Sequence, residues 1–201
     1  MNELTENVHK LIRSNNIADI KLAVKIIETN KDNLDLSYIF DMVKVDKKYN
    51  KDLAINYISK FELTQGLYEV LMGENNSSNQ SSTRMPVDNL TYKSICTFLH
   101  KLRKLTGLPF RLPTVDEWTY CCQGGGSVPE KDGKPQFDKF GGFSKPIESL
   151  EYAWLKENSD DEIHEVGQLK PNKMGLYDMS GNCYEICVDE VMSEKEILNN
   201  M

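Results

Sequence analysis

The sequence predicts an α+β fold with few regular elements and long loops, preceded by a small helical N-terminal region. Three observations carry this prediction. Apolar residues recur at helical spacing through much of residues 1–60. Residues 91–105 form the strongest amphipathic helical pattern of the chain. Residues 124–146 are rich in Gly and Pro and predict long loops, while strand-like alternation elsewhere is short and rare.

The N-terminal region is predicted to be a small helical bundle or arm. Apolar positions at helical spacing occupy residues 7–14, a broad apolar face spans 20–27, and a third stripe covers 36–43. Residues 53–58 close the region. No group of ionisable residues here suggests chemistry, so we expect a scaffold that mediates docking or oligomerisation.

The next segments alternate between predicted helices and polar loops. Residues 61–72 read as a short strand-like stretch that leads into a helix. Residues 73–84 are dominated by Gly, Asn and Ser, and little in them favours an ordered structure. The amphipathic helix of residues 91–105 follows, and Gly107 stands where a helix C-cap is expected.

Composition and charge exclude several classes of protein. The 201 residues carry 24 Lys and Arg against 31 Asp and Glu, a net charge of −7, which disfavours a non-specific nucleic-acid binder. No apolar run approaches the ~20 residues of a membrane-spanning helix. Residues 1–9 are polar and lack the apolar segment of a secretion signal. The five cysteines are odd in number, as is common for free thiols in a reducing compartment. We therefore expect a cytoplasmic protein without nucleic-acid or membrane partners.

Two clusters near the middle of the chain have both a chemical and a structural interpretation. Thr114 and Glu117 have the spacing of a capping box, which explains them without making Glu117 a general acid or base. Cys121 and Cys122 are adjacent, as in a strained redox disulfide or a soft-metal site. Neither a nearby histidine nor a second cysteine pair completes a zinc site. Helix capping and core packing are the favoured interpretations.

A third cluster, at residues 178–187, could serve a cation. Asp178, Asn182 and Glu185 lie close together around Gly181, and hard cations prefer several oxygen ligands on an irregular loop. The alternative is a turn in which the polar side chains bond local backbone amides, and spacing alone favours that turn. Cys187 follows Cys183 at helical spacing, but the sequence identifies no base to activate either thiol.

The order of these motifs resembles the formylglycine-generating enzyme (sulfatase-modifying factor) family. The matching segments follow the family's order: residues 61–68 (FELTQGLY), 70–73 (VLMG), 85–87 (MPV), 109–118 (PFRLPTVDEW), 152–154 (YAW), 158–159 (NS), 166–168 (VGQ), 171–172 (PN) and 175–185 (GLYDMSGNCYE). The resemblance spans about 61–189. It implies a C-type-lectin-like core over 61–189, a helical arm over 1–60 and a charged tail over 190–201.

The resemblance also implies candidate site residues. The family oxidase uses copper to convert a sulfatase cysteine to formylglycine, and it carries a structural calcium on its Gly-Asn-x-x-Glu loop. By that match, the calcium ligands here would be Asp178 and Glu185 through side chains, with Gly181 and Cys183 through backbone carbonyls. The family's copper cysteines lie beyond this loop, in a section that this sequence does not match. Cys183 and Cys187 therefore do not correspond to the copper pair, and no catalytic residue is assigned.

Two functions are compatible with these features. We expect a non-catalytic binding protein whose ligand, a protein or a small molecule, contacts the loops 73–84 and 124–146. The alternative is an oxidase-related enzyme that converts a protein cysteine to formylglycine, completed by a second polypeptide, or a shortened inactive relative. Fold alone does not choose between them, because related domains support unrelated functions.

Overall fold

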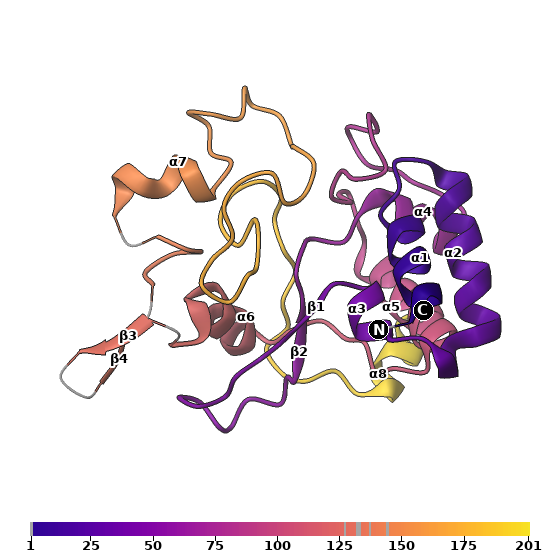
Figure 1. Ribbon diagram of the computed structural model, residues 1–201, viewed down its shortest axis with the longest axis horizontal. Coiled ribbons are helices and arrows are strands. Elements are labelled where there is room, and N and C mark those ends of the chain that lie inside the picture. The colour runs from indigo at the N-terminus through magenta and orange to yellow at the C-terminus, as the bar shows by residue number, and fades with distance from the viewer. Residues whose placement is uncertain (1, 127, 132–133, 137, 144) are drawn as a thin grey trace. The chain divides into compact units, whose positions relative to one another are not determined.

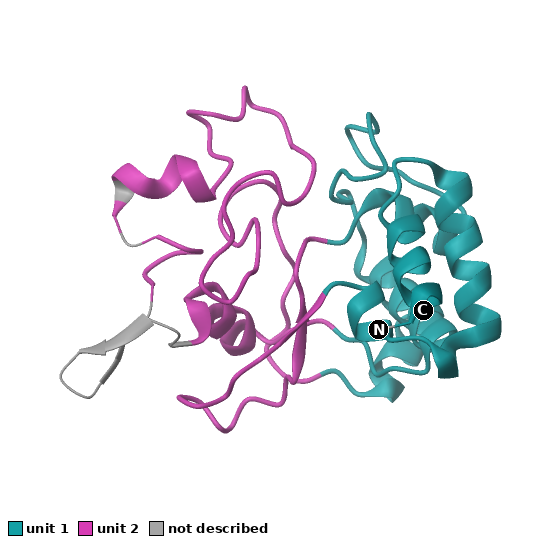
Figure 2. Cartoon of the chain, in the orientation of Figure 1, with its two compact units in different colours: residues 1–41, 63–111, 192–201 teal, residues 42–62, 112–191 magenta. Residues whose placement is uncertain are grey.

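A computed structural model of the chain describes residues 2–126, 128–131, 134–136, 138–143 and 145–201, and it divides the chain into two compact units (Figures 1 and 2). Unit 1 comprises residues 1–41, 63–111 and 192–201, and unit 2 comprises 42–62 and 112–191. Each unit is built from segments that are distant in sequence. The predicted linear division at 60 and 189 therefore differs from the grouping by contacts, and the functional boundaries stay a prediction.

Unit 1 is helical. Its elements are α1 (Glu3–Ile12), α2 (Ile17–Asn30), η1 (Lys31–Asn33), α3 (Leu36–Ile39), α4 (Gln65–Met72), α5 (Tyr92–Thr106) and α8 (Glu194–Asn199). Side-chain caps begin several of them: the carbonyl oxygen of the Asn2 side chain accepts from the Thr5 amide at 2.8 Å, and Thr91 and Ser94 form a reciprocal capping box. Helix α5 ends at Gly107, whose φ of 74° suits glycine, so the predicted helix and its C-cap are confirmed.

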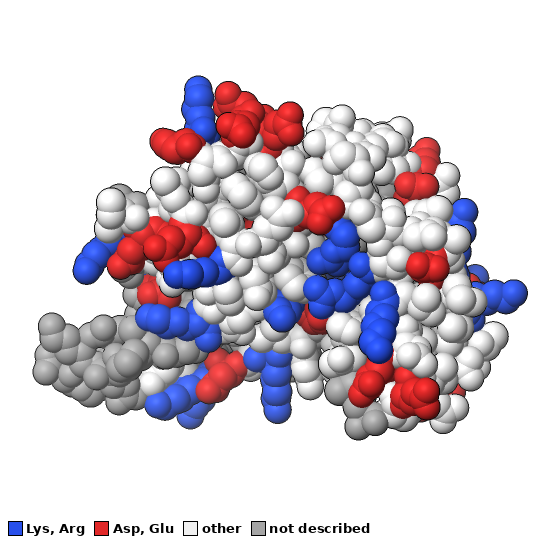
Figure 3. Space-filling model, turned by 45° about the horizontal axis from the view of Figure 1, so that its top comes forward, with Lys and Arg blue, Asp and Glu red and all other residues white. Residues whose placement is uncertain are grey.

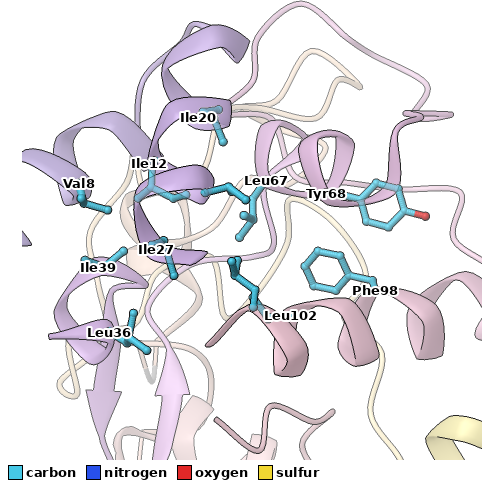
Figure 4. Packing of buried hydrophobic residues seen from close by; sticks show 13 residues of the cluster. Val8, Ile12, Ile20, Ile27, Leu36, Ile39, Leu67, Tyr68, Phe98 and Leu102 are labelled. Atoms are coloured by element: carbon cyan, nitrogen blue, oxygen red, sulfur yellow. The ribbon is translucent and has the colours of Figure 1, made fainter. Parts of the chain in front are cut away.

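The core of unit 1 joins apolar faces from five helices. Ile20 and Ile27 of α2 lie beside Leu67 of α4 and Leu102 of α5, as the close view in Figure 4 shows. Helix α8, in the segment predicted to be a charged tail, packs against α5 and buries Ile197 to 1% exposure. The charged residues of this segment thus occupy the outer face of an amphipathic helix.

Unit 2 has fewer regular elements and a small core of its own. It contains β1 (Met42–Lys44), β2 (Tyr57–Ser59), α6 (Val115–Cys122), η2 (Gly124–Gly126), β3 (Val128–Lys131), β4 (Lys134–Gln136), η3 (Pro146–Glu148) and α7 (Ser149–Tyr152). Strands β1 and β2 pair antiparallel with Val43 opposite Ile58, and β3 pairs antiparallel with β4. A buried cluster that includes Leu53, Tyr120 and Leu176 joins the region of β1 and β2 with α6 and residues 174–179. Helices with small sheets and long connections agree with the predicted α+β class.

The helical prediction for residues 1–60 is wrong beyond Ile39. Val43 lies in β1, and residues 53–58 lead into β2. Asp41 adopts a positive φ of 49°, which ends the helical path and turns the chain into the strand. The apolar residues after Ile39 therefore bury themselves through pairing and packing with distant segments, a tertiary preference that overrides local periodicity.

The segment 73–84 is ordered, contrary to the expectation from its composition. The buried amide of Gln65 donates to the Asn79 carbonyl at 2.8 Å and accepts from the Asn75 side chain at 2.9 Å. The side chain of Gln65 thus binds the loop at two points, Asn75 and Asn79. Such hydrogen bonds hold in place a polar segment that has no apolar residues to bury. Of the second predicted loop, 124–146, residues 127, 132–133, 137 and 144 lie outside the described residues.

No helix in the described ranges combines the length and apolarity that crossing a membrane requires.

Candidate functional site

An acidic cluster in unit 2, which we define as Glu62, Asp178 and Glu185, is the main concentration of perturbed ionisable groups. Glu62 follows strand β2, and the other two residues flank a turn at Gly181. Asp178, Gly181 and Asn182 all have positive φ values, of 56°, 80° and 53°. Three such residues within five positions bend the chain back on itself, so that residues 178 and 185 both approach Glu62.

Glu62 holds this turn from a distant segment of unit 2. Its carboxyl accepts from the Asn182 side-chain amide at 2.8 Å and from the Cys183 backbone amide at 3.0 Å. Asn182 in turn accepts from the His164 amide at 2.9 Å. A single glutamate therefore satisfies two donors of the turn, 120 residues away in sequence.

The ionisation of the cluster is strongly perturbed. Burial, followed by the negative charge of Asp178, raises the pKa of Glu62 to about 9. Burial also raises the pKa of Asp178. Glu185 is exposed as a whole residue. Burial of its carboxyl group nevertheless raises the pKa of Glu185 to about 7. Burial in this cluster thus favours the protonated form of Glu62 near neutral pH.

Asp178 presents one carboxylate oxygen without a partner. The residue is 3% exposed, and its Oδ2 accepts from the Gly167 amide at 2.7 Å. Its Oδ1 is buried and has no hydrogen-bond partner within the described part of the chain. A buried acceptor of this kind is costly unless a proton, a water molecule or a cation satisfies it.

The residues fit a cation only in part. Carboxylates and carbonyls are the ligands that Ca²⁺ prefers, and Asp178 offers an unpartnered oxygen. Across the described residues, however, no group of three or more His, Cys, Asp or Glu side chains is arranged to hold a metal ion. A bound Ca²⁺ would therefore depend on the backbone carbonyls of Gly181 and Cys183 beside the carboxyls of Asp178 and Glu185. This ligand set, predicted from the sequence, stays a prediction.

The turn at Gly181 is packed directly against another segment of unit 2. Gly181 and Trp154 form a parallel bridge, and the Asn182 amide donates to the Trp154 carbonyl at 3.0 Å. A Cβ atom on Gly181 would lie 2.1 Å from the Trp154 carbonyl oxygen. Trp154 stacks on His164 with ring centroids 3.8 Å apart. Only glycine allows this approach, so Gly181 positions the whole cluster.

All five cysteines are free thiols, and burial raises the pKa of Cys121, Cys122 and Cys187. Burial raises the pKa of Cys121 to about 12 and that of Cys122 to about 11. Burial, with the charge of Glu185, raises the pKa of Cys187 to about 11. Cys121 and Cys122 belong to the buried cluster of unit 2, so their predicted packing role is confirmed. Cys183 is half-buried, and its backbone amide belongs to the turn that Glu62 holds.

The capping-box interpretation of Thr114 and Glu117 is also confirmed. The Glu117 amide donates to the Thr114 hydroxyl at 3.2 Å, and the Thr114 amide donates to the Glu117 carboxylate at 2.9 Å. Glu117 is 1% exposed at the start of α6. The carboxylate of Glu117 thus has a structural role in the cap of its own helix.

The sequence did not identify Glu62 as a site residue. Its motif at 61–68 indicated the family but gave no chemical role, because Glu62 lies far from every other acidic group of the site. Its burial beside Asp178 arises only when the end of β2 meets the turn at Gly181. No local sequence pattern predicts a contact between segments so distant in sequence.

Comparison with known proteins agrees with the motifs. The sequence model of the sulfatase-modifying factor enzyme 1-like domain matches residues 36–199, beyond both ends of the segment 61–189 that the motifs indicate. The "Chaperone protein LppX" of Paenibacillus barcinonensis is 27% identical over 186 residues, covering 69% of this chain and 63% of that protein. The chain thus spans less than two thirds of this relative's length. The solved structure of Treponema denticola variable protein 1 aligns with a TM-score of 0.52 and 25% identity, covering 73% of this chain and 68% of that one. The chain belongs to the family of sulfatase-modifying factor enzyme 1-like domains.

Proposed function

We propose that this protein is a non-catalytic binding module, built on a C-type-lectin-like form of the family domain, and that its partner is a protein. The observation that carries the proposal is the state of the thiols. Copper binding and nucleophilic attack by cysteine both require the thiolate. Cys121, Cys122 and Cys187 have pKa values of about 12, 11 and 11, so they are protonated near neutral pH. Such thiols suit packing better than oxidase chemistry.

The non-catalytic proposal and the enzymatic alternative predict opposite results in one assay, and we expect the non-catalytic result. The full chain, loaded with copper(I) and incubated aerobically with a cysteine-containing sulfatase peptide, should leave the peptide unchanged in mass and in thiol content. A formylglycine-generating enzyme of known activity serves as the positive control. Detectable formylglycine in the peptide would refute the non-catalytic assignment.

The class of partner is suggested by the relative that is named a chaperone protein. If this chain likewise binds incompletely folded protein, it should reduce the light scattering that follows dilution of chemically denatured, reduced lysozyme into buffer. We expect suppression that rises with the molar ratio of chain to client. Serum albumin at equal mass concentration controls for crowding, which contributes only weakly. Scattering that matches the albumin sample at every ratio would contradict a chaperone-like role.

We further propose that the loops 73–84 and 124–146 and the helical N-terminal region take part in partner binding. The segment 73–84 supports this role because its backbone is fixed by Gln65 while many of its side chains remain exposed. Charge supports a protein partner over a nucleic acid. On the face shown in Figure 3, acidic side chains occur as well as basic ones. Five free thiols support the proposed cytoplasmic location.

We propose that a structural Ca²⁺ stabilises the turn that carries Asp178 and Glu185, with the carbonyls of Gly181 and Cys183. Millimolar CaCl₂ should then raise the melting temperature near pH ~8, where carboxyl ligands are more fully ionised. An ion present at 100 times its dissociation constant stabilises by about 2.7 kcal/mol. Asp178→Asn should abolish the shift, while the exposed Asp116→Asn in the same unit should preserve it. Melting curves that do not respond to calcium would eliminate the site.

A further inference from the structure

Residues 184–187 form an unpaired backbone segment beside an existing strand-like contact. The next residue, Val188, pairs with the start of helix α6: its amide donates to the Pro113 carbonyl at 3.0 Å, and its carbonyl accepts from the Val115 amide at 3.0 Å. Thr114 and Val188 form a parallel bridge. This pairing anchors one side of the segment.

The backbone of residues 184–187 itself makes no such bonds. These four residues adopt neither helix nor turn nor bend, and in the described structure none of their amides or carbonyls bonds another backbone group. In an extended chain the bonding groups of successive residues point in opposite directions. The backbone amide and carbonyl of Val188 point toward residues 113–115. In an extended chain, the backbone amides and carbonyls of Cys187 and Glu185 would therefore point to the opposite side. That side resembles the free edge of a sheet.

The same two paired segments expose large apolar side chains. Tyr184 is fully exposed at 102%, and Ile186, Val191 and Val115 are exposed at 43%, 47% and 51%. A single exposed apolar side chain needs no explanation. Four on two short, paired segments next to unpaired backbone groups have the composition of a site for an extended peptide, which binds by main-chain bonds and alternate side chains.

The charges around the segment select among peptides. Glu185, Asp189 and Glu190 are all exposed, and no lysine or arginine lies between residues 174 and 191 of the same unit. An approaching strand with basic residues at its ends would be attracted, and an acidic one repelled. We propose that residues 184–187 accept an extended, apolar peptide segment with basic flanks from a partner protein, which adds as a strand to their free edge. This inference rests on the proposed protein-binding function and assigns its site.

The probe that tests this is a short fluorescein-labelled peptide of alternating Val and Thr with Lys at both ends. Fluorescence anisotropy with the full chain should show saturable binding. Methylation of alternate backbone nitrogens on one edge of the peptide should weaken its affinity for the chain at least about tenfold. Replacement of the terminal Lys residues by Glu should weaken the affinity by a similar factor. Binding that is indifferent to N-methylation would overturn strand addition, and absence of binding would overturn the site.

Variants of exposed residues locate the site without disturbing the core. Ile186→Lys and Tyr184→Lys should each weaken binding of the Lys-flanked probe about tenfold or more, because they remove apolar contact and repel the peptide. Leu22→Lys, at an exposed leucine of unit 1, should leave binding unchanged. Unaltered melting curves confirm that all three variants fold. Equal binding by all three would place the probe elsewhere and refute this edge.

The two proposals fail differently. If lysozyme aggregation is suppressed equally by the wild type and by Ile186→Lys, the protein-binding function stands and the assignment to residues 184–187 is wrong. If the wild type neither suppresses aggregation nor binds the probe, both the function and its site are refuted.

Discussion

Gly181→Ala should severely destabilise unit 2, whereas Gly175→Ala should cost only about 1 kcal/mol. The two glycines have nearly equal φ values, 80° and 82°, so the conformational strain of the substitution is similar. The two positions differ in the room available for a side chain. The alanine methyl at 181 would lie 2.1 Å from the Trp154 carbonyl oxygen, whereas at 175 no heavy atom lies within 4 Å. The close atom belongs to the backbone, so relief requires separation of two paired segments.

Tryptophan fluorescence measures this effect selectively. The chain contains two tryptophans, Trp118 and Trp154, and both lie in unit 2. In denaturant titrations followed by fluorescence, Gly181→Ala should lower the free energy of unfolding by more than about 3 kcal/mol or leave unit 2 unfolded in buffer. Helical circular dichroism from unit 1 serves as the internal reference. Equal destabilisation by the two substitutions would show that the backbones at Gly181 and Trp154 have room for a side chain between them.

The stability of unit 2 should fall as the pH rises from weakly acidic to alkaline. The pKa of Glu62 is raised from its usual 4.5 to about 9, and that of Glu185 from 4.5 to about 7. An acid whose pKa is higher in the folded state binds more protons there than in the unfolded state. Its contribution is therefore complete below the unfolded value and is lost as the pH climbs toward the folded value. Each pKa unit corresponds to about 1.4 kcal/mol, so Glu62 contributes most. Glu185 contributes less, because its exposed surface allows solvent screening.

Glu62→Gln isolates the main contribution. Glutamine cannot ionise, so the slope of unfolding free energy against pH should flatten between about 4.5 and 9 in metal-free buffer. Its overall stability should also fall, by about 1–3 kcal/mol, because an amide nitrogen, which only donates, replaces one of the two oxygens that accept from Asn182 and Cys183. Glu157→Gln, at an exposed glutamate of the same unit, should preserve the slope. A variant at position 62 with the wild-type slope would show that Glu62 ionises normally.

Features that are decided within one or two helical turns could be read from the sequence. The helix of residues 92–106, its C-cap at Gly107 and the capping box of Thr114 and Glu117 depend on spacings of three or four residues. Such spacings specify which backbone amides a side chain can reach, without any distant segment. The order of motifs likewise indicated the family, because that order is written along the chain and does not depend on which segments meet.

Features that depend on distant segments could not be predicted. Residues 53–58 look helical in isolation but lead into a strand because β2 finds its partner in β1. The polar segment 73–84 is ordered because the buried Gln65 bonds it at two points. Asp178 and Glu185 were recognised as a candidate pair, yet Glu62, whose pKa is raised by burial and by their charges, lies more than 100 positions away.

The sequence by itself determined the family, the α+β class, the acidic charge and the residues around Gly181, since motif order and composition are properties of the chain. The tertiary structure alone decided that Cys121 is buried with a raised pKa, and that Glu62 lies beside Asp178. It also decided that, in the described structure, residues 184–187 make no backbone–backbone hydrogen bonds. The physical reason is that burial, charge coupling and unsatisfied hydrogen bonds depend on contacts between segments that are distant in sequence. The stability of those contacts depends on the packing of the whole fold.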